Sequence, residues 1–465
     1  MSFGSLRKKT EQQQGILYLW FMKLGVFPYT LLFFAIALNA CEMQNTGTDD
    51  AVSGQDFSGN VARVTEIKFS DYTYHPSIHT VIFSRIGDEI SQPITMLGGD
   101  PLMLHFDDFE TSIKDLYYQV IHCNADWQPS GLMEQEYLDG FPTYNITNYR
   151  RSFNSYQNYV HYSLQIPNEY TKIKRSGNYL LKVFANNDQE RVLLTRRFQV
   201  YENLAPINAV LKRPSNPEDR QYKQEIDLVI NVAQLNVPDV FSDIKIVIRQ
   251  NGRWDNMVHN IKPMFVRDGE LVYDLDEPNT FNGGNEFRYF NTKTLNFNNA
   301  NIAKILRDTV PYEVVLFNDE KRSYKKYITA YDINGMYQVT TDLGSDPHTE
   351  SDYYRVYFFL PFDQPLDSGA VYIYGALSDW QVKPEYKMNY NFRTGRYEHN
   401  LLLKQGFYNY QYVLVNNKQR WPDETAVEGS HFDTENDYHI FVYFRDIRTN
   451  CDRLVGYRKI NSVKN

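Results

Sequence analysis

Cysteine is scarce in this chain of 465 residues, which contains only three. Cys41 lies in a special context described below, whereas Cys123 and Cys451 lie far apart along the sequence. This spacing argues against a disulfide framework of the kind that stabilises small exported domains. We therefore expect both distant thiols to be buried as small apolar side chains.

A surplus of basic residues is also missing. Lys and Arg number 48 against 57 Asp and Glu, which gives a net charge of −9, and the basic residues are scattered along the chain. A nucleic-acid-binding protein usually carries a basic stripe or patch that neutralises phosphates. The sequence therefore predicts that nucleic acid is not a partner.

Catalytic and metal-binding motifs are missing as well. The chain has no HExxH, CxxC or G-x-S-x-G motif, no glycine-rich phosphate loop after a strand and no EF-hand spacing. The closest His pairs, His75 with His79 and His431 with His439, lack a third ligand at a recognisable spacing. We expect no metal, no cofactor, no catalytic residue and no small-molecule ligand, and therefore a protein that is not an enzyme.

One acidic run bears on that expectation. Asp107, Asp108 and Glu110 follow an apolar strand and place three carboxylates close together. Two facing carboxylates can hydrolyse a glycosidic bond, and clustered carboxylates can bind Ca²⁺. A solvated turn explains the same residues equally well. A glycoside hydrolase is therefore the weakest of the alternative functions.

Aromatic residues are abundant and point to β-structure. They make up 15% of the chain, with 37 Tyr and 29 Phe, and many lie in short runs of alternating apolar and polar residues. Such runs are typical of half-buried strands. A short segment, 299–307, is the best candidate for a helix. The sequence predicts an all-β protein.

The strand runs fall into three groups. About seven occur between residues 61 and 202, at the short spacing typical of an immunoglobulin-like sandwich. Joints at 203–207 and 343–347 precede two further groups. We predict three consecutive immunoglobulin-like or early-set β-sandwiches, at 61–202, 203–343 and 344–465.

The N-terminal segment predicts a lipoprotein. An apolar stretch from Tyr29 to Leu38 ends at Ala40 and Cys41, which is the arrangement that a lipoprotein signal peptidase cleaves before the Cys is lipidated. The stretch is shorter than the roughly 20 residues of a membrane span, and Met22 makes a better start than Met1. We expect residues 1–41 to be the signal peptide with the lipidated Cys, and polar residues 42–60 to be a flexible tether to the membrane.

A long loop, about 35 residues from 124 to 158, is rich in Tyr, Asn and Phe. Ordered loops of this length on a sandwich are often binding surfaces, although its aromatics could instead fold back as a cap on the core. Both interpretations stay open. The candidate partner-binding residues are Trp127, Tyr137, Leu138, Phe141, Tyr144, Tyr149 and Tyr156.

The same region resembles a known family. The sequence YYQVIHCNADWQPS at 117–130, followed by EYLDGF at 136–141 and SGNYLLKVF at 176–184, is similar to the N-terminal domain of the type IX secretion system plug proteins of Bacteroidota. The resemblance covers residues 61–202. It implies a protein that closes the periplasmic end of the outer-membrane translocon barrel when no substrate is present, with no catalytic residues. Together with the lipid predicted at Cys41, this places the protein at the outer membrane, facing the periplasm, whereas the cell surface would suit a carbohydrate-binding protein.

A second, weaker resemblance concerns the C-terminal region. Residues 371–380 (VYIYGALSDW) and 405–414 (QGFYNYQYVL) are similar to the glycogen-binding early-set modules of starch enzymes. Those modules stack sugars on exposed Trp, which implies Trp380 and Trp421 as glycan-binding residues here. A carbohydrate-binding surface lipoprotein is therefore the alternative function.

Overall fold

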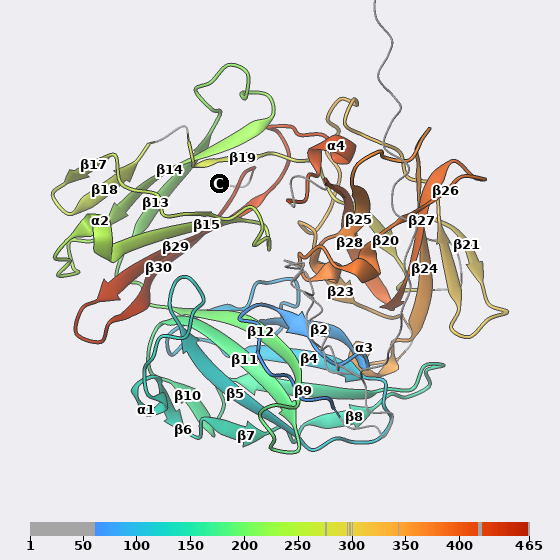
Figure 1. Ribbon diagram of the computed structural model, residues 1–465, viewed down its shortest axis with the longest axis horizontal. Coiled ribbons are helices and arrows are strands. Elements are labelled where there is room, and N and C mark those ends of the chain that lie inside the picture. Colours follow the sequence, from blue (N-terminus) through green and yellow to red (C-terminus); the bar gives the residue numbers. More distant parts are fainter. Residues whose placement is uncertain are drawn as a thin grey trace, which may run out of the picture. The chain divides into compact units, whose positions relative to one another are not determined.

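The computed structural model describes residues 61–463, apart from 275–276, 295, 297–298, 300, 343 and 417–420. Cys41, the predicted signal peptide and the tether 42–60 lie outside the described residues. The described chain consists of strands with a few short helical turns (Figure 1). The predicted all-β class is therefore confirmed.

The first sandwich is built from residues 72–201. Its strand runs alternate between the core and the outside, as in β5 (Leu116–Cys123), where every second residue is buried. One sheet contains β1 (Tyr72–Thr73), β12 (Val192–Tyr201), β11 (Gly177–Ala185), β5 and β7 (Thr143–Asn145), with β3 (Ile94–Met96) beside β12. The other contains β2 (Ile78–Arg85), β4 (Leu102–Asp108), β9 (Val160–Ile166) and β8 (Tyr149–Arg151). A separate ribbon pairs β6 (Leu138–Gly140) with β10 (Thr171–Ile173).

The second sandwich has one sheet from the middle of the chain and one that is completed by its C-terminal part. The first sheet contains β13 (Ile207–Lys212), β14 (Lys223–Asn231), β18 (Glu270–Tyr273), β17 (Phe265–Arg267) and β19 (Thr280–Asn282). The second contains β16 (Val258–His259), β15 (Ile244–Gln250), β29 (Asp437–Asp446) and β30 (Cys451–Asn461). Apolar side chains of both sheets form one core.

The third sandwich lies between β19 and β29 in the sequence. One sheet contains β20 (Arg288–Asn291), β28 (Gly406–Val415), β23 (Tyr337–Val339) and β25 (Ala370–Tyr374). The other contains β21 (Ile302–Leu306), β22 (Glu313–Leu316), β24 (Tyr353–Pro361), β27 (Arg396–Lys404) and β26 (Asn389–Asn391). Its core is rich in Tyr and Phe.

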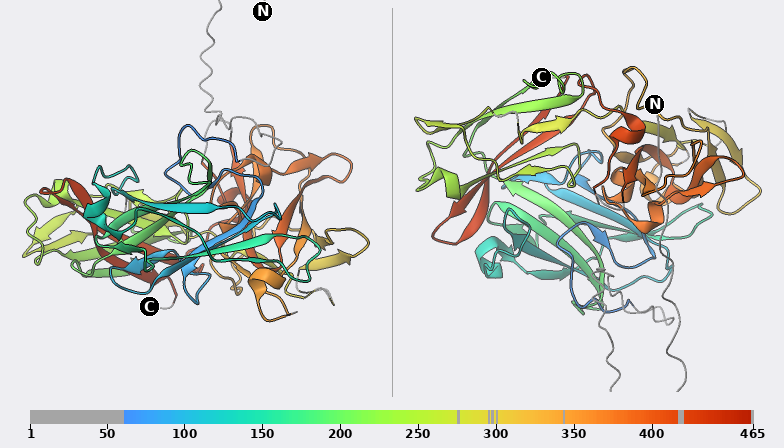
Figure 2. Two further views of the ribbon diagram at one scale, coloured as in Figure 1. Left: turned by 90° about the horizontal axis from the view of Figure 1, so that it is seen from below. Right: turned by 45° about the horizontal axis from the view of Figure 1, so that its top comes forward.

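This arrangement differs from the predicted succession of three sandwiches. β29 pairs with β15 along seven residues, from Ile244↔Phe444 to Gln250↔Tyr438, so the last hairpin belongs to the second sandwich and not to the third. Figures 1 and 2 show these red strands among the green strands of the second sandwich. The alternating pattern of a strand indicates which side chains are buried, but not which strand it pairs with.

The predicted helix at 299–307 is also wrong. Ile302–Leu306 forms β21, which pairs with β22. Short apolar runs suit a strand as well as a helix, and tertiary pairing decides between them. The helices that do form are single turns: α1 (Glu134–Tyr137), α2 (Val240–Asp243), α3 (Pro347–Glu350), α4 (Thr425–Glu428), η1 (Ala376–Ser378) and η2 (Pro384–Tyr386).

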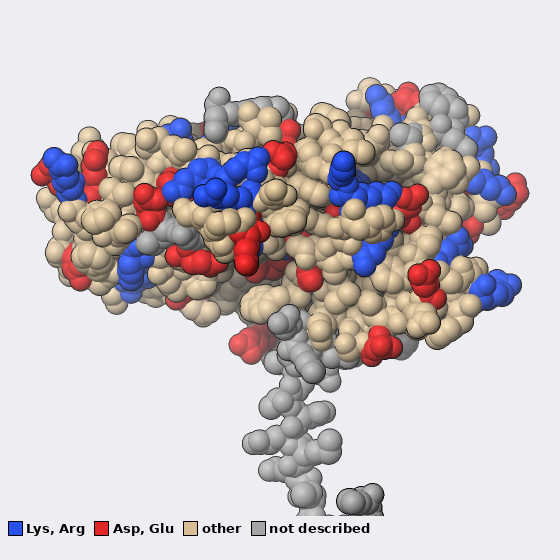
Figure 3. All heavy atoms as spheres, turned by 90° about the horizontal axis from the view of Figure 1, so that it is seen from above, with Lys and Arg blue, Asp and Glu red and all other residues tan. Residues whose placement is uncertain are grey.

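The two distant cysteines lie in the part of the chain that the structure describes. Cys123 and Cys451 are both buried, as predicted, and both carry free thiols. No helix within the described ranges has the length and apolar character to cross a membrane. On the face drawn in Figure 3, Lys and Arg lie among Asp and Glu and between wide uncharged areas.

Candidate functional site

The candidate loop splits into a buried part and an exposed part. Trp127, Tyr137 and Leu138 are buried, and the latter two pack into the core of the first sandwich. The indole of Trp127 meets Trp254 of the second sandwich edge-on, with ring centroids 5.2 Å apart. These three residues act as a cap and as a joint between sandwiches, so their side chains are little accessible to an external partner.

Two other residues of the loop form an exposed aromatic surface together with a neighbour. Phe141 is 58% exposed and lies 5.8 Å, between ring centroids, from the half-buried Tyr144. Tyr144 in turn stacks on Tyr170 at 4.0 Å with an angle of 14° between the rings. We call Phe141, Tyr144 and Tyr170 the aromatic surface. Tyr170 was missed from the sequence because it lies outside the loop, just before β10.

The far part of the loop contacts the third sandwich. The carboxylate of Asp352 accepts hydrogen bonds from the backbone N–H groups of Tyr156 and Gln157, at 2.9 and 3.2 Å. The Tyr312 hydroxyl bonds that of Tyr156 at 2.6 Å. Tyr149 lies on the edge strand β8 and is exposed. The loop therefore helps to hold two sandwiches together.

The acidic run at the end of β4 is structural. The alternative of a solvated turn does not hold for Asp107 and Asp108, which are both fully buried. Asp108 forms an ion pair with Lys114. Asp107 accepts hydrogen bonds from Lys404 Nζ at 2.5 Å and from the Tyr353 hydroxyl at 2.6 Å. Desolvation acts to raise the pKa of Asp107, but Lys404 and the bond from His161 hold it below its ordinary value.

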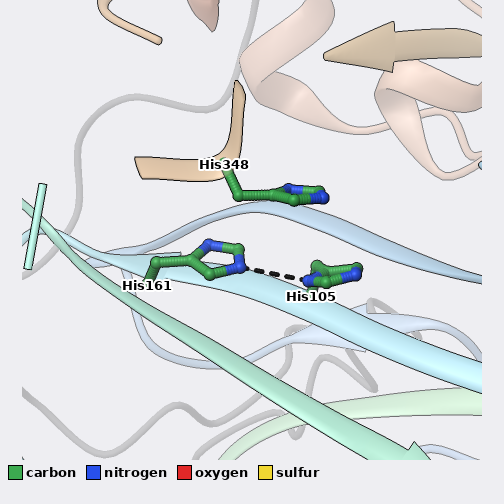
Figure 4. Close-up of side chains that lie close together, drawn as sticks. All are labelled: His105, His161 and His348. Carbon is green, nitrogen blue, oxygen red and sulfur yellow. Dashed lines mark hydrogen bonds between the residues drawn. The ribbon is translucent and has the colours of Figure 1, made fainter. Parts of the chain in front are cut away.

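Beside this ion pair lies a cluster of three His (Figure 4). His105 comes from β4, His161 from β9 and His348 from α3 of the third sandwich. His105 Nδ1 lies 3.0 Å from His161 Nε2, and the ring of His348 stacks on that of His105 with centroids 4.0 Å apart. Sequence reasoning missed this cluster because His348 belongs to another sandwich, far along the chain.

Burial lowers the pKa of two of these imidazoles, His105 and His161. Burial, with the nearby His348 and His161, lowers the pKa of His105 to about 2. Burial also lowers the pKa of His161, although the hydrogen bond to Asp107 acts in the opposite direction. Neutral imidazoles carry free lone pairs, which can accept a proton or bind a metal ion.

The two Trp implied by the glycogen-binding resemblance lie in different environments. Trp380 is buried and packs edge-on against Phe287 and Tyr374, at centroid distances of 5.9 and 5.7 Å. Trp421 is 71% exposed, beside a pocket that polar residues line. A Trp that stacks on a sugar needs one exposed face, and the buried Trp380 offers little open surface.

Comparisons with known proteins agree with the fold. The family described as "Type 9 secretion system plug protein 1st domain" matches residues 78–202. A crystal structure of a hypothetical protein from Parabacteroides merdae superposes with a TM-score of 0.82 and 32% identity, over 85% of this chain and 100% of its own. A Salmonella alpha-2-macroglobulin mutant aligns with 10% identity and a TM-score of 0.15, over 86% of this chain and 24% of its own, too weakly to indicate a shared fold. No curated protein matches the chain.

These findings define the class of the protein: it is a chain of β-sandwich domains whose plug-type first domain is joined to two further sandwiches. The resemblance seen in residues 117–141 is confirmed by the match at 78–202. Residues 78–202 belong to the family of first domains of type 9 secretion system plug proteins.

Proposed function

We propose that this protein is a non-enzymatic plug that closes the periplasmic end of the type IX translocon barrel when no substrate occupies it. The match of residues 78–202 to the plug first domain carries this proposal. A plug must keep its shape under load. Buried polar contacts between sandwiches support such rigidity, for example the hydrogen bonds of the Tyr443 hydroxyl with Asn178 and Gln199, each at 2.8 Å.

The aromatic surface is the part of the candidate loop that suits a partner best. Phe141 and Tyr170 are exposed, and the rings of both stack against Tyr144. Aromatic side chains provide a large contact area with little loss of side-chain entropy, which is why they are enriched at interfaces. In this proposal the surface of Phe141, Tyr144 and Tyr170 contacts the barrel, and the exposed Tyr149 on β8 is a further candidate contact.

Membrane attachment completes the proposal. Lipidation of Cys41 would hold the protein at the outer membrane, facing the periplasm, and residues 42–60 would act as the tether. Restricting the protein to a membrane surface raises its effective concentration beside the barrel. Cys41→Ala should abolish labelling by radioactive palmitate and leave the fold unchanged, whereas continued labelling would contradict lipidation at this residue.

The barrel interaction can be tested by affinity purification of the translocon from membranes. The wild-type protein should co-purify, and Phe141→Ser combined with Tyr170→Ser should reduce co-purification at least tenfold. Phe392→Ser is the matched control, because Phe392 is 81% exposed on the third sandwich, away from the plug-type domain. Deletion of the gene should also make the outer membrane permeable to large antibiotics. A barrel that never co-purifies, with an unchanged permeability, would reject the proposal.

One observation favours a second candidate, a carbohydrate-binding surface lipoprotein. Exposed Trp421 lies beside a pocket lined also by Asp255, Asn282 and Glu424, so an apolar face stands next to hydrogen-bonding groups. This combination suits a sugar ring. Binding of soluble glucans, measured by calorimetry and lost in Trp421→Ala but not in Trp380→Phe, would support it. An unchanged heat signal with every glucan would exclude it.

A further inference from the structure

We propose that His105, His161 and His348 form a binding site for one divalent transition-metal ion, with Zn²⁺ as the expected occupant. The site lies between the first and the third sandwich, because His105 and His161 are on strands β4 and β9, whereas His348 is on α3 (Figure 4). Nothing in the plug function requires a metal, so this inference goes beyond it.

The distances bring the donor atoms close to coordination geometry. One ring nitrogen from each of the three His lies within 4.8 Å of the other two. A tetrahedral Zn²⁺ has Zn–N bonds of about 2.0–2.1 Å, which places neighbouring ligand nitrogens about 3.3 Å apart. His105 Nδ1 and His161 Nε2 are already 3.0 Å apart. Binding would require the His348 ring to turn out of its parallel stack on His105, where the rings are 13° apart, so that its nitrogen lone pair points at the ion.

The chemistry of the donor set fits zinc and its neighbours in the transition series. Imidazole nitrogen suits Zn²⁺, Cu²⁺ and Ni²⁺, whereas Ca²⁺ and Mg²⁺ require oxygen ligands. In the metal-free cluster His105 Nδ1 carries a proton and donates it in a hydrogen bond to His161 Nε2. On binding, His161 Nε2 would donate its lone pair to the ion, and the proton of His105 would move from Nδ1 to Nε2, so that Nδ1 also becomes a ligand.

Carboxylates stand behind two of the three imidazoles. Asp107 Oδ1 lies 2.7 Å from His161 Nδ1, which leaves His161 Nε2 facing the cluster. Glu89 Oε1 lies 3.1 Å from His348 Nε2. Protein metal sites commonly hold each ligating His by such a second hydrogen bond, which fixes the ring and makes it a stronger donor.

Glu89 also provides local negative charge. Its second oxygen, Oε2, is buried and has no hydrogen-bond partner among the described residues. The nearby cation Lys404 is neutralised by Asp107 at 2.5 Å, so it does not repel an incoming ion with its full charge. The remaining position of a tetrahedral ion would be open to water.

A metal bound here would cross-link two sandwiches. Its ligands would come from residues 105 and 161 on one side and from residue 348 on the other. A ligand that binds only the folded state stabilises it in proportion to the logarithm of its concentration. Zn²⁺ should therefore raise the melting temperature of the protein. The increase should disappear when His348, the ligand from the third sandwich, is substituted.

Titration of the tag-free full chain with Co²⁺ tests the site, because cobalt reports its own coordination by visible absorption. We expect one equivalent to bind, with absorption typical of a nitrogen-rich tetrahedral site, and Zn²⁺ to displace it. His348→Asn should weaken Co²⁺ binding at least 100-fold and abolish the Zn²⁺-dependent rise in melting temperature. His259→Asn is the matched control, because His259 is exposed on strand β16.

The folding of each variant can be separated from its metal binding. In excess EDTA, His348→Asn should melt within a few degrees of the wild type, and if it fails to fold, Glu89→Gln serves as a second variant with an expected loss of about 10-fold. Binding that does not saturate, or that is equally tight in the wild type, in Glu89→Gln and in a folded His348→Asn, would overturn the proposal.

Discussion

Lys404 Nζ of the third sandwich donates a hydrogen bond of 2.5 Å to Asp107 Oδ2 of the first, and both side chains are buried. The amine also donates to the carbonyl oxygen of His348 at 2.6 Å, so a single cation connects β4, α3 and β27. A buried charge without its partner is costly, because neither water nor another group replaces the lost interaction.

Asp107→Asn should lower the free energy of unfolding by about 3–5 kcal/mol, since it leaves Lys404 buried and unpaired. Combining it with Lys404→Met should restore part of that loss, because both charges are then removed. Urea-induced unfolding followed by tryptophan fluorescence measures both effects. If the single variant loses less than about 1 kcal/mol, the pair does not stabilise the protein.

Stability should fall in mild acid because of the His cluster. The pKa of His105 is about 2 in the folded state, below its ordinary value, so the unfolded chain takes up the proton first as the pH drops. The contribution of His105 is complete above about pH 6.5 and decreases by up to about 1.4 kcal/mol per pH unit below it. The depressed pKa of His161 acts in the same direction.

Urea titrations of the metal-free protein at pH 7.5 and pH 5 measure this dependence. His105→Gln cannot be protonated, so the difference between its stabilities at the two pH values should be smaller than that of the wild type. His259→Gln, with an exposed side chain, should keep the wild-type difference. An equal pH dependence in all three proteins would contradict the assignment to His105.

Trp254 should stabilise the contact between the first and second sandwiches. Its ring lies between the guanidinium groups of Arg197 and Arg249, at 3.7 and 3.8 Å from the ring centroid. Arg249 is fully buried, and burial together with Arg197 lowers its pKa to about 10. The negative faces of the indole partly compensate two neighbouring cations.

Trp254→Ala should therefore cost about 2 kcal/mol or more, from lost packing and from the two cation–π contacts. Trp421→Ala provides the control, because Trp421 is largely exposed and its loss should change stability by less than about 0.5 kcal/mol. Thermal unfolding distinguishes the two variants. Equal melting temperatures for both variants would show that the contacts of the indole with Arg197 and Arg249 do not stabilise the protein.

Gly335 should tolerate no side chain. It has a φ of +77°, and an added Cβ would approach Phe287 Cε1 to 2.7 Å and collide with the indole of Trp380. Gly335→Ala should cost more than about 3 kcal/mol. Gly284→Ala is the matched control, because Gly284 has a φ of +67° but no atom within 4 Å of the added Cβ. It should cost only about 1 kcal/mol from backbone strain, and chemical denaturation separates the two.

The strands of the first sandwich were predictable from the sequence, whereas the contacts between sandwiches were not. The alternation from Leu116 to Cys123 reflects a local property, the side of the sheet on which each side chain lies, and it appears in the structure as β5. The pairing of β15 with β29 depends on two segments nearly two hundred residues apart. The alternating pattern of one segment does not indicate that the other is its partner.

In the candidate sites, too, local features could be predicted from the sequence, whereas contacts between sandwiches could not. The loop from 124 to 158 could be recognised by its length and composition, but the separation of buried Trp127 from exposed Phe141 depends on Trp254 of the second sandwich. The burial of Asp107 depends on Lys404, and the His cluster depends on His348. Each of these contacts joins different sandwiches, and short-range sequence patterns do not encode them.

The insertion of the third sandwich between β19 and β29 has a consequence for biogenesis. During translation, β15 can pair with β29 only after all the residues of the third sandwich have been synthesised. Until then the edge of β15 that pairs with β29 is open, and its apolar residues Ile244, Ile246 and Ile248, all buried in the finished protein, lack part of their cover. The nascent chain therefore has a long window of aggregation risk, in which a chaperone would be of most use.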